Sequence, residues 1–211
     1  MEREQNLIHD LETVRKAFSG NLPGRLCHST MIPPWRRELK DPEEGLRPAS
    51  VLILLYPDRG RLFFPLIERS AGKAPHGGQI AFPGGAVEKD ETDEAAALRE
   101  AKEELDVDPE SLELAGRLTP VAVSVSRYLM TPFVAIAPEI PAFRPSPAEV
   151  ALWFPVDLDE LLDEGSRTAA IMRHDGEDKR VPCFRLAGRV VWGATAMVLA
   201  EFAELVRRSA P

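Results

Sequence analysis

Three glutamates near the middle of the chain have the spacing that brings carboxylates together on one side of a helix. Glu100, Glu103 and Glu104 lie in the stretch EAAALREAKEEL, residues 94–105. Side chains three and four positions apart on a helix are neighbours, and like charges at that spacing repel each other. Converging carboxylate oxygens are the ligands that hard divalent cations such as Mg²⁺ and Mn²⁺ prefer. The spacing therefore predicts a metal site on one face of this helix.

The residues around this helix have types that suit the same site. Glu91 precedes the helix, and Arg99 lies one turn before Glu103, where its guanidinium can hold a carboxylate in orientation. Gly84 and Gly85 allow the backbone to turn tightly and to present a main-chain carbonyl to a metal. The competing interpretation is a solvated helix stabilised by i,i+4 ion pairs, since Ala and Glu are both good helix formers.

The segments around the glutamates predict the elements that position them. A helix is expected from Thr92 or Asp93 to Leu105, with Thr92 as its N-cap and acidic residues in its first turn. Apolar spacing predicts an amphipathic helix over residues 4–18, a short helix at Leu158–Leu162 and a closing helix at Thr195–Arg207.

Short apolar runs predict the strands, two pairs of which form hairpins around 57–60 and around Ala187-Gly188. These strands are Val51–Tyr56, Leu62–Ile67, Ile80–Phe82, Leu112–Leu118, Val121–Val125, Thr131–Ala137, Val150–Phe154, Val181–Leu186 and Arg189–Trp192. Strands and helices alternate without regular βαβ spacing, so we expect an α/β protein with a mixed sheet flanked by helices.

Composition limits the classes of function. The chain has 211 residues, which suits one domain with extensions or at most two small domains. Its net charge of −8 is unfavourable for binding nucleic acid. No apolar run is long enough to span a membrane, and the charged N-terminal stretch does not look like a secretory signal. Cys27 and Cys183, the two cysteines, have no paired spacing, so a cytoplasmic protein is expected.

The positions of the acidic residues resemble a known signature. From Gly85 the pattern runs through Glu91 to Arg99-Glu100 and then Glu103-Glu104, and it resembles the Nudix box G-x5-E-x7-R-E-U-x-E-E-x-G-U, where U is apolar. Asp106 stands at the final Gly of the box, which ends the helix in a left-handed turn that Asp tolerates better than most residues.

The resemblance implies a fold and a chemistry. The fold is an α/β/α sandwich around a mixed sheet, here with N-terminal and C-terminal helical extensions. The division it implies is an N-terminal helix and irregular extension over residues 1–45, followed by a Nudix hydrolase domain over residues 46–211 that includes the C-terminal helix. Enzymes of this family hydrolyse a diphosphate linked to another group, with Mg²⁺ or Mn²⁺ neutralising charge and activating water.

The resemblance also assigns roles to residues. It makes Glu100, Glu103 and Glu104 metal ligands, direct or through water, and makes the carbonyl of Gly84 a further ligand. Glu91 and Arg99 brace the loop and the helix. The general base of the family lies on the box helix or on a later loop, and the candidates here are Glu103 and Glu149.

The segment before the box bears on the substrate. RSAGKAPHGGQIAFPGG, residues 69–85, resembles the segment that marks coenzyme A diphosphatases within the family. On this basis Arg69, His76 and Gln79 are expected on the substrate side, with Arg69 as a phosphate partner. Ala74 departs from the pattern, which has an Arg there, although Lys73 is adjacent.

Three functions are therefore compatible with the sequence. The first is hydrolysis of coenzyme A or acyl-CoA to 3′,5′-ADP and 4′-phosphopantetheine or its acyl form. The second is hydrolysis of another nucleotide, such as ADP-ribose, NADH or a nucleoside triphosphate. The third is a non-catalytic module that binds a nucleotide. The expected partner is a small nucleotide diphosphate rather than a nucleic acid or a membrane, and a homodimer is possible.

Overall fold

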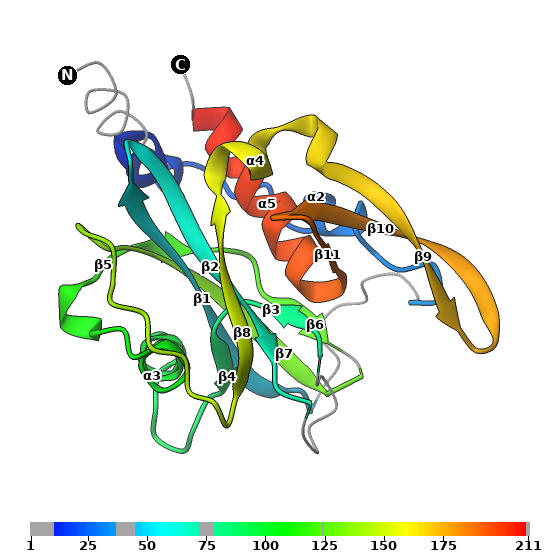
Figure 1. Cartoon of the computed structure of the whole chain (residues 1–211), viewed down its shortest axis with the longest axis horizontal. Coiled ribbons are helices and arrows are strands. Elements are labelled where there is room, and N and C mark those ends of the chain that lie inside the picture. Colours follow the sequence, from blue (N-terminus) through cyan, green and yellow to red (C-terminus); the bar gives the residue numbers. More distant parts are fainter. Residues whose placement is uncertain (1–10, 37–44, 72–77, 124, 210–211) are drawn as a thin grey trace.

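A mixed β-sheet forms the centre of the molecule. The computed structural model describes residues 11–36, 45–71, 78–123 and 125–209. In this part of the chain the main sheet has eight strands, and β1 (Arg47–Asp58) lies at its centre (Figure 1). The other strands are β2 (Arg61–Arg69), β3 (Ile80–Ala81), β4 (Gly84–Ala86), β5 (Glu113–Arg117), β6 (Val121–Val123), β7 (Tyr128–Ile136) and β8 (Val150–Asp157).

Strand β1 shows why the sheet is mixed and covered on both faces. It pairs in parallel with β7 and antiparallel with β2 and β4. Its side chains alternate between two apolar clusters, so that Val51, Ile53 and Leu55 enter one cluster and residues 52, 54 and 56 enter the other. A strand that is buried on both faces has a continuous apolar sequence, which is how this strand was predicted.

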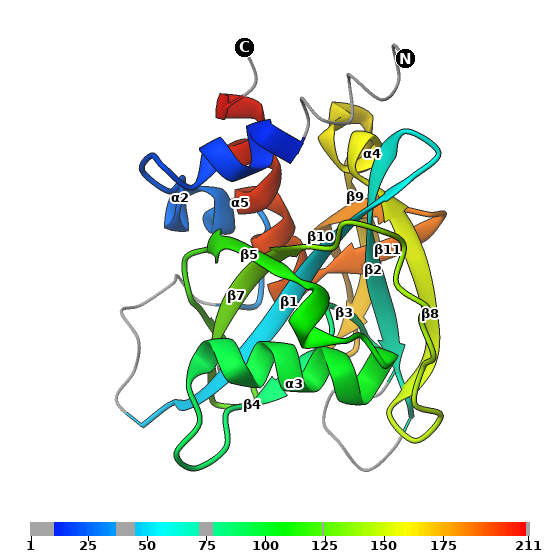
Figure 2. The ribbon, with the colours of Figure 1, turned by 90° about the vertical axis from the view of Figure 1, so that its left-hand side faces the viewer.

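One helix covers each face. The helix α3 (Asp93–Leu105) packs on β1 from one side, and α5 (Gly193–Ser209) packs on the opposite side of the sheet (Figure 1). Figure 2 shows α3 crossing in front of the sheet with α5 behind it. The predicted α/β/α sandwich around a mixed sheet is therefore confirmed, and so is its C-terminal helix.

The ends of α3 agree with the sequence prediction. The hydroxyl of Thr92 accepts a hydrogen bond of 3.1 Å from the N–H of Ala95 and caps the helix. Asp106 ends it in the left-handed conformation, with φ 58° and ψ 33°, and donates its N–H to the carbonyl of Lys102. The left-handed turn expected at the final position of the box signature is thus present, with an aspartate in place of the Gly.

A second, three-stranded sheet extends from the sandwich. It consists of β9 (Arg167–His174), β10 (Glu177–Leu186) and β11 (Arg189–Trp192), joined by tight turns at Asp175-Gly176 and Ala187-Gly188. The hairpin around Ala187-Gly188 was predicted, but β9 and the first residues of β10 were not. Strand β9 is exposed or half-buried along its length, so it lacks the apolar alternation on which the strand prediction relied.

The N-terminal segment packs on the closing helix. Residues 11–17 are helical, which agrees with the described part of the predicted N-terminal helix, and Leu7 and Ile8 lie outside the described residues. The short helix α2 (Arg25–Ser29) packs against α5, where the buried His28 places Nε2 2.8 Å from Oε2 of Glu201. The described residues before 46 thus share the core of the sandwich.

The remaining short elements are α4 (Leu158–Leu162), which has the predicted bounds, and the 3₁₀ turns η1 (Pro109–Ser111) and η2 (Glu164–Ser166). Among the helices that the structure describes, none combines the length and the apolar character needed to cross a bilayer.

Candidate metal centre

Three carboxylates converge beside strand β4. One oxygen each from Glu100, Glu104 and Glu149 lies within 4.8 Å of the others. Glu100 and Glu104 come from α3, and Glu149 comes from the residue before β8. Glu104 is fully buried, Glu100 is half-buried and Glu149 is exposed, so the cluster opens to solvent on one side.

Glu104 provides the test of whether the residues fit a cation. Its Oε2 accepts a hydrogen bond of 2.9 Å from the N–H of Gly84. Its Oε1 lies 3.1 Å from Nη2 of Arg69 but without hydrogen-bond geometry, so this buried oxygen has no hydrogen-bond partner. Burial raises the pKa of Glu104 to about 7, although Arg69 and the N–H of Gly84 act in the opposite direction. A buried carboxylate oxygen without a donor fits a site for a divalent ion.

The two glycines of β4 allow the helix to approach the sheet. A Cβ on Gly85 would lie 2.3 Å from Oε1 of Glu100, and a Cβ on Gly84 would lie 2.3 Å from the carbonyl oxygen of Ser50. Both contacts are far below van der Waals distance: at Gly84 a side chain would meet the main chain of β1, and at Gly85 it would have to displace the Glu100 carboxylate. The lack of side chains here brings the Glu100 carboxylate against the main chain of β4.

Arg99 ties the acidic loop to the helix. Its Nε and Nη2 donate to the carboxylate of Glu91 at 2.9 and 3.1 Å, and its Nη1 donates to Glu100 at 2.9 Å and to Glu103 at 3.0 Å. Its Nη2 also donates to the carbonyl of Ala86. These hydrogen bonds lower the pKa of Glu91, whereas burial raises the pKa of Glu100 despite its contact with Arg99. These contacts join the loop before α3 to the helix, and the bracing role of Glu91 and Arg99 stays a prediction.

The third carboxylate of the cluster comes from Glu149 and not from Glu103, the residue that helix spacing suggests. Glu103 is half exposed, points to Arg99 and stands outside the three-carboxylate cluster. Glu149 takes the third place in the cluster, although it is 45 residues beyond Glu104 in sequence. The metal-ligand role expected for Glu103 therefore has a structural alternative in Glu149.

A Pro-rich loop brings Glu149 to the cluster. The N–H of Ser146 donates to the carbonyl of Glu104, and the N–H of Arg144 donates to the carbonyl of Leu105, each at 2.9 Å. These bonds satisfy carbonyls at the end of α3 that have no partner within the helix. The carbonyl of Glu149 in turn accepts from the N–H of Ser70. The role of Ser146 was missed, because it depends on main-chain contacts that residue types do not reveal.

The residues expected on the substrate side are distributed as follows. Arg69 faces the cluster, with Nη1 donating to the carbonyl of Gly84 at 2.9 Å. Gln79 is exposed, and its main-chain carbonyl accepts a hydrogen bond of 3.1 Å from the main-chain N–H of Arg69. His76 lies outside the described residues, as do Lys73 and Ala74.

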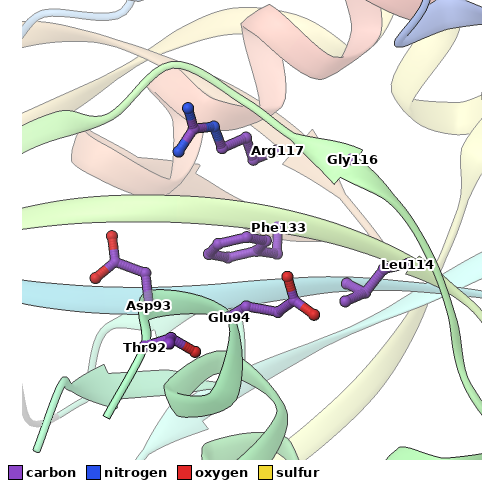
Figure 3. A pocket seen from close by; sticks show the side chains of 7 residues that line it. All are labelled: Thr92, Asp93, Glu94, Leu114, Gly116, Arg117 and Phe133. Carbon is purple, nitrogen blue, oxygen red and sulfur yellow. The ribbon is translucent and has the colours of Figure 1, made fainter. Parts of the chain in front are cut away.

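A separate pocket lies beside the first turn of α3. It has a volume of about 480 Å³ and is bounded by that helix and by β5 and β7 (Figure 3). Its lining residues are Thr92, Asp93, Glu94, Leu114, Gly116, Arg117 and Phe133. None of the three clustered carboxylates belongs to this lining, so the pocket is distinct from the metal centre.

Comparison with known proteins identifies the family. The model of the NUDIX domain matches residues 46–174. The protein named uncharacterized Nudix hydrolase NudL from Photorhabdus laumondii subsp. laumondii is 34% identical over 178 residues, covering 83% of this chain and 92% of that protein. The protein of the same name from Citrobacter koseri is 40% identical over 158 residues, covering 74% and 81%. The chain therefore belongs to the Nudix family.

A solved structure agrees on the fold. The MutT protein from Methanosarcina mazei Go1 superposes with a TM-score of 0.53 at 17% identity, covering 80% of this chain and 99% of that one. Nudix hydrolases act on pyrophosphate bonds and generally use divalent metal ions, which agrees with the carboxylate donors found beside β4.

Proposed function

We propose that this protein hydrolyses the diphosphate bond of coenzyme A or acyl-CoA, with Mg²⁺ or Mn²⁺ bound by Glu100 and Glu104 and with Glu149 as the general base beside them. The observation that carries the metal assignment is the convergence of these three carboxylates, one of which, Glu104, has a buried oxygen without a hydrogen bond. The substrate assignment is supported by residues 69–85, whose pattern resembles that of coenzyme A diphosphatases.

The chemistry needs a cation and a positioned base. A bound divalent ion neutralises charge on the diphosphate and makes water a better nucleophile at neutral pH. Glu100 and Glu104 would hold the ion, and Arg99 donates a hydrogen bond to Glu100 that keeps its carboxylate in place. The carbonyl of Gly84 is a further ligand in this proposal.

Glu149 is the base that the geometry favours over Glu103. Its carboxylate is exposed at the open side of the cluster, whereas Glu103 is paired with Arg99. The water oxygen bonds to one phosphorus as the bond from that phosphorus to the bridging oxygen breaks. The proton of the water passes to the base, and the products are 3′,5′-ADP and 4′-phosphopantetheine or its acyl form.

A second substrate class is favoured by one departure from the pattern. Ala74 stands where the coenzyme A segment has an Arg, and this change removes a basic group from the substrate side. ADP-ribose, NADH or a nucleoside triphosphate is therefore the alternative substrate. A purely binding function is disfavoured, because a nucleotide-binding module has no need of three converging carboxylates.

We also propose a division of the chain into two parts and a location in the cell. Residues 46–211 form the hydrolase domain, and residues 1–45 form an extension whose described part packs on α5. The free thiols of Cys27 and Cys183 favour a reducing, cytoplasmic setting. A homodimer stays a prediction, which light scattering of the purified protein tests.

The test is a competition between substrates. The purified protein is incubated with Mg²⁺ or Mn²⁺ and an equimolar mixture of coenzyme A, ADP-ribose, NADH and diadenosine polyphosphates, and the products are measured by mass spectrometry. Preferential formation of 3′,5′-ADP and phosphopantetheine supports the proposal. Cleavage of another member instead rejects coenzyme A as the substrate, and no cleavage of any member favours the binding-module alternative. Glu104→Gln serves as the inactive control.

A further inference from the structure

The side chain of Arg69 occupies a position between two oxygen atoms of the proposed metal centre. Its Nη1 donates to the carbonyl oxygen of Gly84 at 2.9 Å, and its Nη2 lies 3.1 Å from Oε1 of Glu104. Both oxygens belong to groups that the proposed function assigns to the metal. The guanidinium is positively charged and has only hydrogen-bond donors, so it interacts with the same oxygens that a metal ion would bind.

The main chain around Arg69 is held on three sides. Its N–H donates to the carbonyl of Gln79 and its carbonyl accepts from the N–H of Gly78, while the next N–H, that of Ser70, donates to the carbonyl of Glu149. These bonds fix the Cα of Arg69 beside the cluster. The side chain of Arg69 is 29% exposed and therefore has a route to solvent.

The two arginines at the cluster differ in what they neutralise. Arg99 is shared among Glu91, Glu100 and Glu103, and it braces the loop through Ala86. Within the described residues, Arg69 is the ion-pair partner of the fully buried Glu104. A buried carboxylate is costly without a compensating cation, so Arg69 supplies that charge when no divalent ion is bound.

We infer that Arg69 is an internal counter-cation that competes with the divalent metal for Glu104 and the Gly84 carbonyl. This inference rests on the metal assignment in the proposed function. A divalent ion at these oxygens and a guanidinium on the same oxygens repel each other at contact distance. Metal binding then requires the guanidinium to move away from these oxygens. Once displaced, the guanidinium of Arg69 is available to bind the phosphates of a substrate.

The experiment measures metal affinity without substrate. Isothermal titration with Mn²⁺ alone is performed on the full chain, on Arg69→Gln and on Arg61→Gln. Arg61 is the matched control because it lies on the same strand, loses the same charge and pairs instead with Asp157 and Asp159. We expect Arg69→Gln to bind Mn²⁺ ~10-fold more tightly than the wild type. Arg61→Gln should stay within about twofold, because its charge is exposed and screened.

Thermal melting of the metal-free proteins gives a second readout. Arg69→Gln should melt at a lower temperature than the wild type without metal, since Glu104 loses its ion-pair partner, and Mn²⁺ should recover most of that difference. If the Gln variant does not fold, Arg69→Lys serves in its place. A single ammonium does not reproduce the two-pronged contact with both oxygens, so this variant should also bind Mn²⁺ more tightly than the wild type.

The outcomes separate this inference from the proposed function. Equal or weaker Mn²⁺ binding by Arg69→Gln overturns the competition and makes Arg69 a residue that supports the metal site. A wild type that binds no Mn²⁺ overturns both the inference and the metal assignment. A wild type that binds Mn²⁺ but leaves coenzyme A intact rejects only the substrate, and the comparison of Arg69→Gln with Arg61→Gln still decides the role of Arg69.

Discussion

The backbone N–H of Gly84 donates a 2.9 Å hydrogen bond to Oε2 of Glu104, and this bond joins strand β4 to helix α3 at a fully buried carboxylate. With Oε2 held by this bond, the second oxygen, Oε1, lies 3.1 Å from Nη2 of Arg69. A main-chain donor cannot be removed by changing a side chain. Substitutions at Glu104 and at the neighbouring glycine therefore test the centre most directly.

Glu104→Gln should lower kcat by at least ~100-fold while the fold survives, because metal-centred charge stabilisation is worth several kcal/mol. The amide oxygen of Gln can still accept from Gly84, so the melting temperature without metal should stay close to that of the wild type or rise. The measurements are steady-state kinetics and circular dichroism melting. Glu94→Gln, an exposed change on the same helix, is the control. An unaltered rate in Glu104→Gln rejects the site assignment.

Gly85→Ala should damage the site more than the fold. The added Cβ would lie 2.3 Å from the carboxylate of Glu100, which is the end of a flexible side chain and is able to move away. We expect a ~10-fold or greater loss of Mg²⁺ affinity with little change in melting temperature. Gly20→Ala is the control, since nothing lies within 4 Å of its Cβ position. Normal Mg²⁺ affinity in Gly85→Ala would show that Glu100 is not needed at this position.

Arg99→Lys should fail to replace arginine despite keeping the charge. The guanidinium contacts Glu91 through two nitrogens and also reaches Glu100 and Glu103, a geometry that one ammonium does not reproduce. We expect kcat to fall by ~10-fold or more and the melting temperature to fall by about 2–6 °C.

Arg15→Lys provides the comparison for this prediction. Arg15 makes a two-nitrogen contact with Glu113 at 2.8 and 2.7 Å, but on the surface and away from the carboxylate cluster. Exposed pairs contribute about 0–1 kcal/mol, so its kinetics should not change and its melting temperature should change little. Similar losses in both variants would mean that Arg99 has no special role.

Mg²⁺ should stabilise the folded protein, since it binds the carboxylate cluster only when the cluster is assembled. An ion at 100 times its dissociation constant adds about 2.7 kcal/mol to the free energy of unfolding. For a chain of this size, that corresponds to a rise of about 5–10 °C in melting temperature. The measurement is a melting curve with Mg²⁺ and with a chelator. Glu104→Gln should show a much smaller rise, and an equal rise would place the stabilising ion elsewhere.

The stabilisation by Mg²⁺ should depend on pH with a known sign. Burial raises the pKa of Glu104 from 4.5 to about 7, so without metal the folded protein binds this proton more tightly than the unfolded chain does. The contribution of Glu104 to the free energy of unfolding is therefore largest below pH 4.5 and is lost as the pH rises through 7.

Mg²⁺ binds the deprotonated carboxylate, so its stabilising effect should be large at pH 8 and should shrink as the pH falls below 7. Melting curves at pH 6, 7 and 8 with and without Mg²⁺ measure this trend. In Glu104→Gln the Mg²⁺-dependent shift in melting temperature should be small and nearly independent of pH. A shift that grows toward pH 6 in the wild type would contradict the role of Glu104.

Several features were predictable because they depend on neighbours in sequence. Thr92 caps α3 and Asp106 ends it, and both effects arise within one helical turn. The apolar run in β1 predicts a buried strand, and the turn residues Ala187-Gly188 predict a hairpin; both are present. Strand β9 escaped prediction, because its half-exposed side chains carry no apolar alternation.

The spacing of the box residues by itself determined the family and the helix that carries Glu100 and Glu104. The tertiary structure decided which carboxylates meet. Helix spacing puts Glu103 beside Glu100, yet Arg99 holds Glu103 outside the cluster, and main-chain bonds from a distant loop bring in Glu149. The same holds for Arg69, whose residue type suggests a phosphate partner but whose side chain lies on Glu104. Local backbone preferences act between residues a few positions apart, whereas the pairing of buried charges depends on chain segments that only folding brings together.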